Sequence, residues 1–133
     1  MNGMKSGLHV PICLLLLLAC LVSVGTWSAR KLDSEAGVLL DITDRIRRSL
    51  EERNYEQAQY GCDLLIAQWE EYYPHWTMLI NHQEMDHIFE SVNKLRQFLR
   101  FRDDVDSWAE LDTLVHFIHH VPEKESLSIQ NLL

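Results

Sequence analysis

The chain has 133 residues, which is the length of one small domain. Its 20 acidic residues outnumber 12 basic ones, so the formal net charge is -8. All of the acids follow Arg30, and only Lys5 among the basic residues precedes it. The surface beyond Arg30 is therefore acidic and repels nucleic acid, which argues against a nucleic-acid partner.

A nearly uncharged apolar run extends from Val10 to Trp27. Because a helix needs about 20 apolar residues to cross a bilayer and tolerates about 17, this run predicts one membrane-spanning helix. Trp27 suits the membrane interface. We therefore divide the chain into an N-terminal signal anchor, residues 1–29, and an acidic helical domain, residues 30–133, and expect residues 10–27 to contact the membrane.

Three fates of the apolar run stay open, of which an uncleaved anchor is favoured. Ser23-Val24-Gly25 supplies small residues at a workable spacing for cleavage of a secretory signal. Leu17-Leu18-Ala19-Cys20 loosely matches the box in which a lipoprotein cysteine is lipidated. Basic residues lie on both flanks, so the positive-inside rule does not decide the orientation. The short N-terminal tail favours an N-terminus inside and an exported domain.

The acidic domain lacks strand-like alternation, and its apolar residues recur at spacings of three and four, so we expect helices. The first runs from about Asp33 to Arg53. The second begins at the N-cap Asn54 with Gln57 as its capping-box partner. It ends at Pro74, because the residue before a proline avoids the helical region. The apolar faces of these two helices are Leu39, Ile42, Ile46 and Leu50, and Tyr55, Ala58, Cys62, Leu65, Ile66 and Trp69.

The third helix is expected from about Pro74 to Arg102, and the fourth from Asp103 or Asp104 to Pro122. The third carries a seven-residue apolar repeat typical of a coiled-coil seam, with one polar position. This seam consists of Met78, Asn81, Met85, Ile88, Val92, Leu95 and Leu99. The fourth helix has an apolar stripe of Val105, Trp108, Leu111, Leu114, Val115, Ile118 and Val121. The apolar tail 127–133 is expected to pack back on the bundle.

Short connections favour antiparallel neighbours. The sequence thus predicts an all-α fold, in which an N-terminal membrane-spanning helix precedes a mainly antiparallel bundle of about four helices.

Four separate segments carry a resemblance to a known family. They are Trp69, the run Leu79-Ile80-Asn81-His82-Gln83-Glu84-Met85-Asp86-His87-Ile88, the run His119-His120-Val121-Pro122-Glu123-Lys124-Glu125 and the run Ser128-Ile129-Gln130-Asn131-Leu132-Leu133. In their order and spacing, from about Asp33 to Leu133, the chain resembles the bacterial family named domain of unknown function 4363. The resemblance implies a small membrane-anchored helical protein of Gram-positive, often spore-forming, bacteria. It implies no activity.

Histidines gather on the predicted fourth helix, where His116, His119 and His120 are three and four residues apart. If the third and fourth helices are antiparallel, His82 lies about as far from their turn as this group does. His82, Asp86, His116 and His120 would then supply nitrogen and oxygen ligands to a divalent metal. A pH-sensing histidine cluster is another interpretation.

His82 and Asp86 are four residues apart and share a helix face, so we expect this pair to organise the packing of the bundle. Four aromatic residues gather at the junction of the second and third helices: Trp69, Tyr72, Tyr73 and Trp76. They form either core that caps the bundle or, if exposed together, a surface for a partner. We take this aromatic corner as the candidate contact surface.

No catalytic motif is present, since no serine of the domain has the glycine neighbours of an exposed nucleophile and no phosphate-binding glycine loop occurs. We therefore expect no enzyme and no cofactor. The leading hypothesis is an interaction or accessory protein at the outer face of the cytoplasmic membrane. Its partner would be a membrane or envelope protein or a second copy of the chain. The alternative is a histidine/carboxylate metal- or pH-sensing extracytoplasmic domain.

Overall fold

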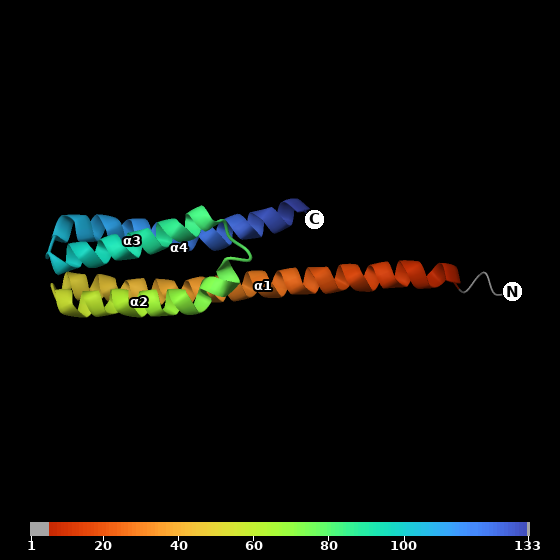
Figure 1. The fold of residues 1–133 in the computed structure, drawn as a ribbon, viewed down its shortest axis with the longest axis horizontal. Coiled ribbons are helices and arrows are strands. Elements are labelled where there is room, and N and C mark those ends of the chain that lie inside the picture. The colour runs from red at the N-terminus through yellow and green to blue at the C-terminus, as the bar shows by residue number, and fades with distance from the viewer. Residues whose placement is uncertain (1–5, 133) are drawn as a thin grey trace.

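One long helix projects from a bundle of antiparallel helices (Figure 1). The computed structural model describes the backbone of residues 6–132 and the side chains of residues 7–124. The helices in this part of the chain are α1 (Ser6–Glu51), α2 (Tyr55–Trp76), α3 (His82–Arg100) and α4 (Asp104–Leu132), and none of the described residues is in a strand. The predicted all-α fold with an apolar N-terminal helix is confirmed.

Helix α1 combines the apolar segment and the first helix of the bundle in one continuous element of 46 residues. The sequence predicted a separate bundle helix that starts near Asp33. The chain between Trp27 and Asp33 contains good helix formers such as Ala29 and Leu32 and has no breaker, so the helix continues through it. Large apolar side chains up to Trp27 are exposed, whereas Leu32 is fully buried. By length and composition, α1 is the one described helix that could cross a membrane.

The second half of α1 and the other three helices form the bundle. Helices α1 and α2 make one antiparallel hairpin and α3 and α4 make the other, and α2 also packs on α3 and α4 on α1. The turns within both hairpins lie at one end, and the α2–α3 connection lies at the end from which the apolar half of α1 projects (Figure 1). The predicted apolar faces meet in one core, which includes Leu39, Ile46, Leu65, Met85, Val92, Leu95, Leu111 and Leu114.

Two of the four predicted helix starts are confirmed, those at Asn54 and Asp103. The side chain of Asn54 accepts a hydrogen bond from the backbone N–H of Gln57 at 3.1 Å, and that of Asp103 accepts one from the backbone N–H of Asp106 at the same distance. Each bond satisfies a donor that a helix start leaves unpaired.

The predicted helix ends at the two prolines are wrong. Pro74 lies inside the last turn of α2, and Pro122 lies inside α4. A proline removes one N–H donor from a helix and crowds the preceding turn, which weakens the helix there but does not end it at either position. The tail 127–133 therefore extends α4 as far as Leu132 instead of turning back, and its side chains lie outside the described residues.

Helix α3 begins later than predicted. The segment from Thr77 to Ile80 forms turns, and the Asn81 side chain accepts a hydrogen bond from the backbone N–H of Gln83 at 3.0 Å. Asn81 is thus an N-cap and not a seam position. Met78 is 75% exposed for the same reason, because it lies in the connection before the helix. On α4, the predicted stripe is wrong at Val105, which is 78% exposed.

Equivalent positions in the two hairpins are separated by a constant number of residues, which we call the hairpin offset. Their second helices begin at Tyr55 and Asp104, and these two positions are 49 residues apart. The same hairpin offset separates Glu51 from Arg100, where the first helices end. It also separates Arg53 from Arg102, which both have left-handed backbone, with φ of 55° and 56°.

Ion pairs between the hairpins follow the same correspondence. Arg47 pairs with Asp112 at 2.8 Å, and Arg96 pairs with Asp63 at 3.0 Å. The hairpin offset relates the two arginines to each other, and it relates the two aspartates as well. This reciprocal contact is what a two-fold axis produces, so the bundle has approximate two-fold symmetry.

Candidate functional site

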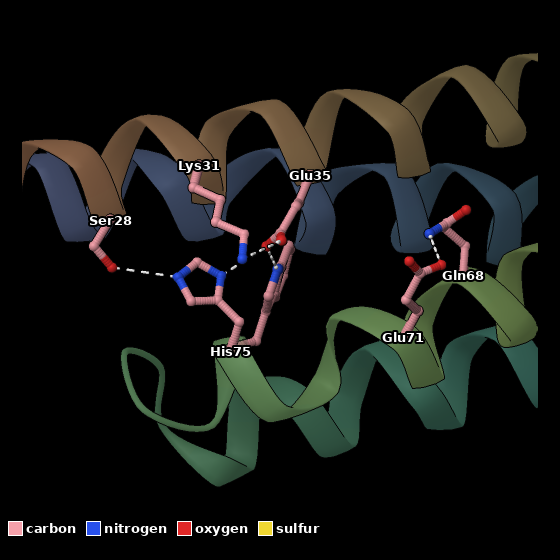
Figure 2. Close-up of polar contacts among 7 residues, drawn as sticks. Ser28, Lys31, Glu35, Gln68, Glu71 and His75 are labelled. Carbon is pink, nitrogen blue, oxygen red and sulfur yellow. Dashed lines mark hydrogen bonds and ion pairs between the residues drawn. The ribbon is translucent and has the colours of Figure 1, made fainter.

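A buried carboxylate lies where the bundle meets the apolar half of α1. Glu35 on α1 is only 8% exposed. Its Oε2 atom accepts a hydrogen bond from Nε1 of Trp76 at 2.9 Å and lies 2.8 Å from Nδ1 of His75 (Figure 2). Oε1 lies 3.7 Å from Nζ of Lys31. Burying a carboxylate is costly unless such donors surround it, so this group needs all three neighbours.

His75 links the carboxylate to a second side chain of α1. An ionised carboxylate only accepts hydrogen bonds, so the Nδ1 atom of His75 must donate to Glu35. The Nε2 atom lies 3.3 Å from Oγ of Ser28 (Figure 2). A hydroxyl both donates and accepts, so Ser28 can bond the neutral and the protonated imidazole. Together, Ser28, Lys31, Glu35, His75 and Trp76 form the junction cluster.

The junction cluster fixes the last residues of α2 to α1 within about two turns of Trp27. An open cleft of about 730 Å³ lies beside it, lined by Trp27, Lys31, Glu35, Tyr72, His75 and Met78 among others. Burial, followed by the nearby carboxylates of Glu35 and Glu71, raises the pKa of the Tyr72 phenol above its ordinary value. Tyr72 therefore stays a neutral donor beside this cleft.

A second group of side chains lies between α3 and α4. The rings of His87 and Phe117 stack with centroids 5.4 Å apart, and those of His116 and His120 stack at 5.5 Å. These four residues line a pocket of about 260 Å³ with Glu84, Val121 and Lys124. Outside the pocket lining, a Glu123 carboxylate oxygen lies 3.4 Å from Nδ1 of His120. We call the pocket and the residues that line it the histidine groove.

Comparison with known families shows to which family the chain belongs. The family model described as a domain of unknown function (DUF4363) matches residues 26–132. The chain belongs to the DUF4363 family. No curated protein and no solved structure matches it. The matched region of this DUF4363 protein contains the junction cluster, the histidine groove and both hairpins.

The predicted metal ligands do not gather in one place. His116 and His120 lie together in the histidine groove, whereas His82 and Asp86 are exposed near the start of α3 and do not line it. Among the described residues, no three His, Cys, Asp or Glu side chains form a group that could hold a metal ion. The geometry therefore gives the metal hypothesis no support. The His82 and Asp86 side chains are both exposed, so their burial does not support the expected role of this pair in organising the bundle.

The aromatic corner is mainly core. Trp69 and Trp76 are buried and meet edge to face with ring centroids 5.2 Å apart. Tyr73 contacts Trp69 at 6.3 Å and is the exposed member, while Tyr72 is half-buried. Of the two interpretations left open by the sequence, the structure supports packing, since neither tryptophan is available to a partner.

Sequence reasoning did not single out Glu35 or His75. One local signal was present, because Glu35 lies between Leu32 and Leu39 at spacings of three and four on a face that the core buries. A lone acid on such a face indicates a buried partner. The identity of that partner depends on the register of α2 against α1, which the sequence does not specify.

Proposed function

We propose that this DUF4363 protein is a single-pass interaction module, anchored in the cytoplasmic membrane, whose bundle lies at the outer face and binds another membrane or envelope protein. The observation that carries the proposal is the continuity of α1. Its first half exposes large apolar side chains from Leu8 to Trp27, and an apolar helix of this length is stable in hydrocarbon. Its second half is one helix of the bundle and packs against α2 and α4.

A continuous helix suits a module that holds a surface at a fixed place relative to the membrane. The junction cluster clamps α2 to α1 immediately beyond the apolar half, so the bundle and the anchor are joined without a flexible linker. The far end of the bundle then lies at a set height above the bilayer.

The far end offers a contact surface in place of the aromatic corner. Phe101 is 76% exposed in the α3–α4 turn, and Val105 on the first turn of α4 is exposed to a similar extent. The arginine between them, Arg102, adds the residue type that protein interfaces favour beside apolar anchors. We call Phe101, Arg102 and Val105 the tip. A partner that binds there would not disturb the core or the junction cluster.

Photo-crosslinking of the full chain in its own membranes tests the proposal. A photoreactive side chain at Phe101 should give one discrete adduct, and the same group at Asp41, an exposed position in the bundle half of α1, should not. Val105→Ser should weaken the adduct without unfolding the bundle, because Val105 is exposed. Equal adducts from both positions, or none from Phe101, would contradict the interaction role. Labelling of the tip by a membrane-impermeant reagent tests its location outside.

The histidine groove favours proton sensing as a second candidate function, and the divalent-metal form of this candidate has only the proximity of His116 and His120 behind it. Two stacked imidazoles repel each other when both are protonated, and Lys124 adds a further positive charge, while Glu84 and Glu123 oppose it. Zinc titration followed by the melting temperature tests the metal form. Stabilisation that disappears in His120→Gln would support it, and an unchanged melting temperature near neutral pH would count against it.

A further inference from the structure

The end of α4 extends along α1 toward the apolar half of that helix. The ion pair of Arg47 with Asp112 sets the register of the antiparallel helices α1 and α4, so Pro122 lies at about the height of Gly37, and both residues line one cavity. From Pro122, α4 continues for ten residues to Leu132, or about 15 Å at the helical rise. On α1, Trp27 is likewise ten residues, about 15 Å, from Gly37. The end of α4 therefore reaches about the height of Trp27, and Figure 1 shows α4 extending along α1 beyond the α2–α3 connection.

The composition of α4 changes about two turns before this end. Glu123, Lys124 and Glu125 are consecutive charged residues, and Lys124 is paired with Glu84 of α3. No residue from Ser126 to Leu133 has a charged side chain, and half of these eight are leucine or isoleucine. A helix satisfies its own backbone hydrogen bonds, so an uncharged helical segment can enter the boundary between headgroups and acyl chains at low cost.

We propose that residues 126–132 of α4 insert into the interfacial layer of the same membrane that α1 crosses, so that the bundle contacts lipid at a second place. The inference rests on the proposed anchoring by α1 and adds a second contact to it. The height agrees with this partner, because the segment ends at about the level of Trp27, an aromatic residue that suits the membrane interface.

Other side chains at this end of the bundle suit the same layer. Trp27 is exposed, and the Lys31 ammonium lies 5.5 Å from the centroid of its ring. Met78, in the α2–α3 connection at the same end, is also exposed. Tryptophan and lysine are the residues that proteins place at the water–lipid boundary. The membrane contact would thus involve α1, the α2–α3 connection and α4, and such a contact would limit rotation of the bundle about α1.

Depth-dependent quenching in vesicles tests the inference. The full chain, with Cys13, Cys20 and Cys62 replaced by alanine, is reconstituted in phosphatidylglycerol and phosphatidylethanolamine vesicles. An environment-sensitive fluorophore is attached through Ile129→Cys or, as the matched control on the exposed side of α4, Thr113→Cys. We expect shallow spin-labelled lipids to quench the probe at position 129 several-fold more than the probe at position 113. Leu127→Glu combined with Leu132→Glu should abolish this difference.

The outcomes separate the two proposals. If the chain does not float with vesicles, the anchoring by α1 fails and the inference fails with it. If the chain floats but the probe at position 129 stays in water, only the second contact is overturned. A blue-shifted probe at position 129 that lipid spin labels do not quench would indicate a contact with protein, such as a second copy, and would also overturn it.

Discussion

Nδ1 of His75 lies 2.8 Å from Oε2 of Glu35, and this contact joins the end of α2 to α1 beside the apolar segment. Its counterpart in the other hairpin, at the hairpin offset, is the pair of Lys124 with Glu84. The two pairs differ in burial. The His75 and Glu35 side chains are 12% and 10% exposed, whereas those of Lys124 and Glu84 are 54% and 27% exposed. The pair of His75 with Glu35 is therefore buried, whereas the pair of Lys124 with Glu84 lies near solvent.

This difference in burial predicts unequal costs for the same substitution. Glu35→Gln should lower the free energy of unfolding by about 2 kcal/mol, because the buried donors of His75 and Trp76 lose a charged acceptor. Glu84→Gln removes the corresponding carboxylate from a more exposed pair and should cost less than about 1 kcal/mol. Urea denaturation of both variants measures the difference. Equal losses would mean that burial of the junction cluster does not stabilise the bundle.

The Cys62 thiol should be unreactive while the bundle is folded. Burial raises its pKa to about 12, so at pH 8 the thiolate is about 1000-fold rarer than at the ordinary value of 9.0. In a chain with Cys13→Ala and Cys20→Ala, alkylation by iodoacetamide should be slow at pH 8 and fast in urea. Fast alkylation without urea would contradict the buried position of this residue.

The same pKa predicts a dependence of stability on alkaline pH. The folded state holds the Cys62 proton more tightly than the unfolded state, so the contribution is complete below pH 9 and is lost as the pH rises toward about 12. Within that range, wild type should lose up to about 1.4 kcal/mol more per pH unit than Cys62→Ala. Parallel stability curves for the two proteins would contradict this prediction.

Local patterns were sufficient to predict the class of the fold. Spacings of three and four identified the buried faces of the helices, and Asn54 and Asp103 were recognised as caps, because both signals depend only on neighbours in the sequence. The helix ends predicted at the two prolines were wrong, although they too were predicted from local sequence. Helix α2 continues past Pro74 to the buried Trp76, and α4 continues past Pro122, so the local preference at the two prolines did not decide the helix ends.

The junction cluster and the symmetry depended on long-range information. Glu35 and His75 are 40 residues apart and meet only because α2 folds back on α1 in one register. The two hairpins share few identical residues at equivalent positions, since buried positions need only fit the space. Cys62 in one hairpin corresponds to Leu111 in the other, and both are buried. The correspondence therefore becomes visible in ion pairs and turns.

The symmetry itself suggests a stabilising substitution. Ser107 is buried, and its hydroxyl has no hydrogen-bond partner among the described residues. The equivalent position in the first hairpin is Ala58, which is equally buried. Ser107→Ala should raise the free energy of unfolding by about 1 kcal/mol, because an unpaired buried hydroxyl is costly. Thermal melting measures this change. A lower melting temperature would indicate a partner for the hydroxyl.

Two glycines in helices should respond to alanine in opposite directions. A Cβ atom at Gly61 on α2 would lie 2.5 Å from Cγ1 of Ile46 on α1, whereas one at Gly37 would have nothing within 4 Å. Ile46 is fully buried and its branched side chain is stiff, so it cannot move aside easily. Gly61→Ala should therefore destabilise the bundle by about 1–3 kcal/mol. Gly37→Ala should stabilise it by about 0.5–1 kcal/mol, because alanine lowers the entropy lost in forming the helix.

Chemical denaturation of the full chain in detergent measures both changes, with Gly37→Ala as the matched control for helix propensity. The close approach of α1 and α2 at Gly61 fixes the register in which Glu35 meets His75. Gly61→Ala should accordingly also weaken the junction cluster, and the additional loss caused by Glu35→Gln should be smaller in that background than in wild type. Additive losses would show that the two contacts between α1 and α2 are independent.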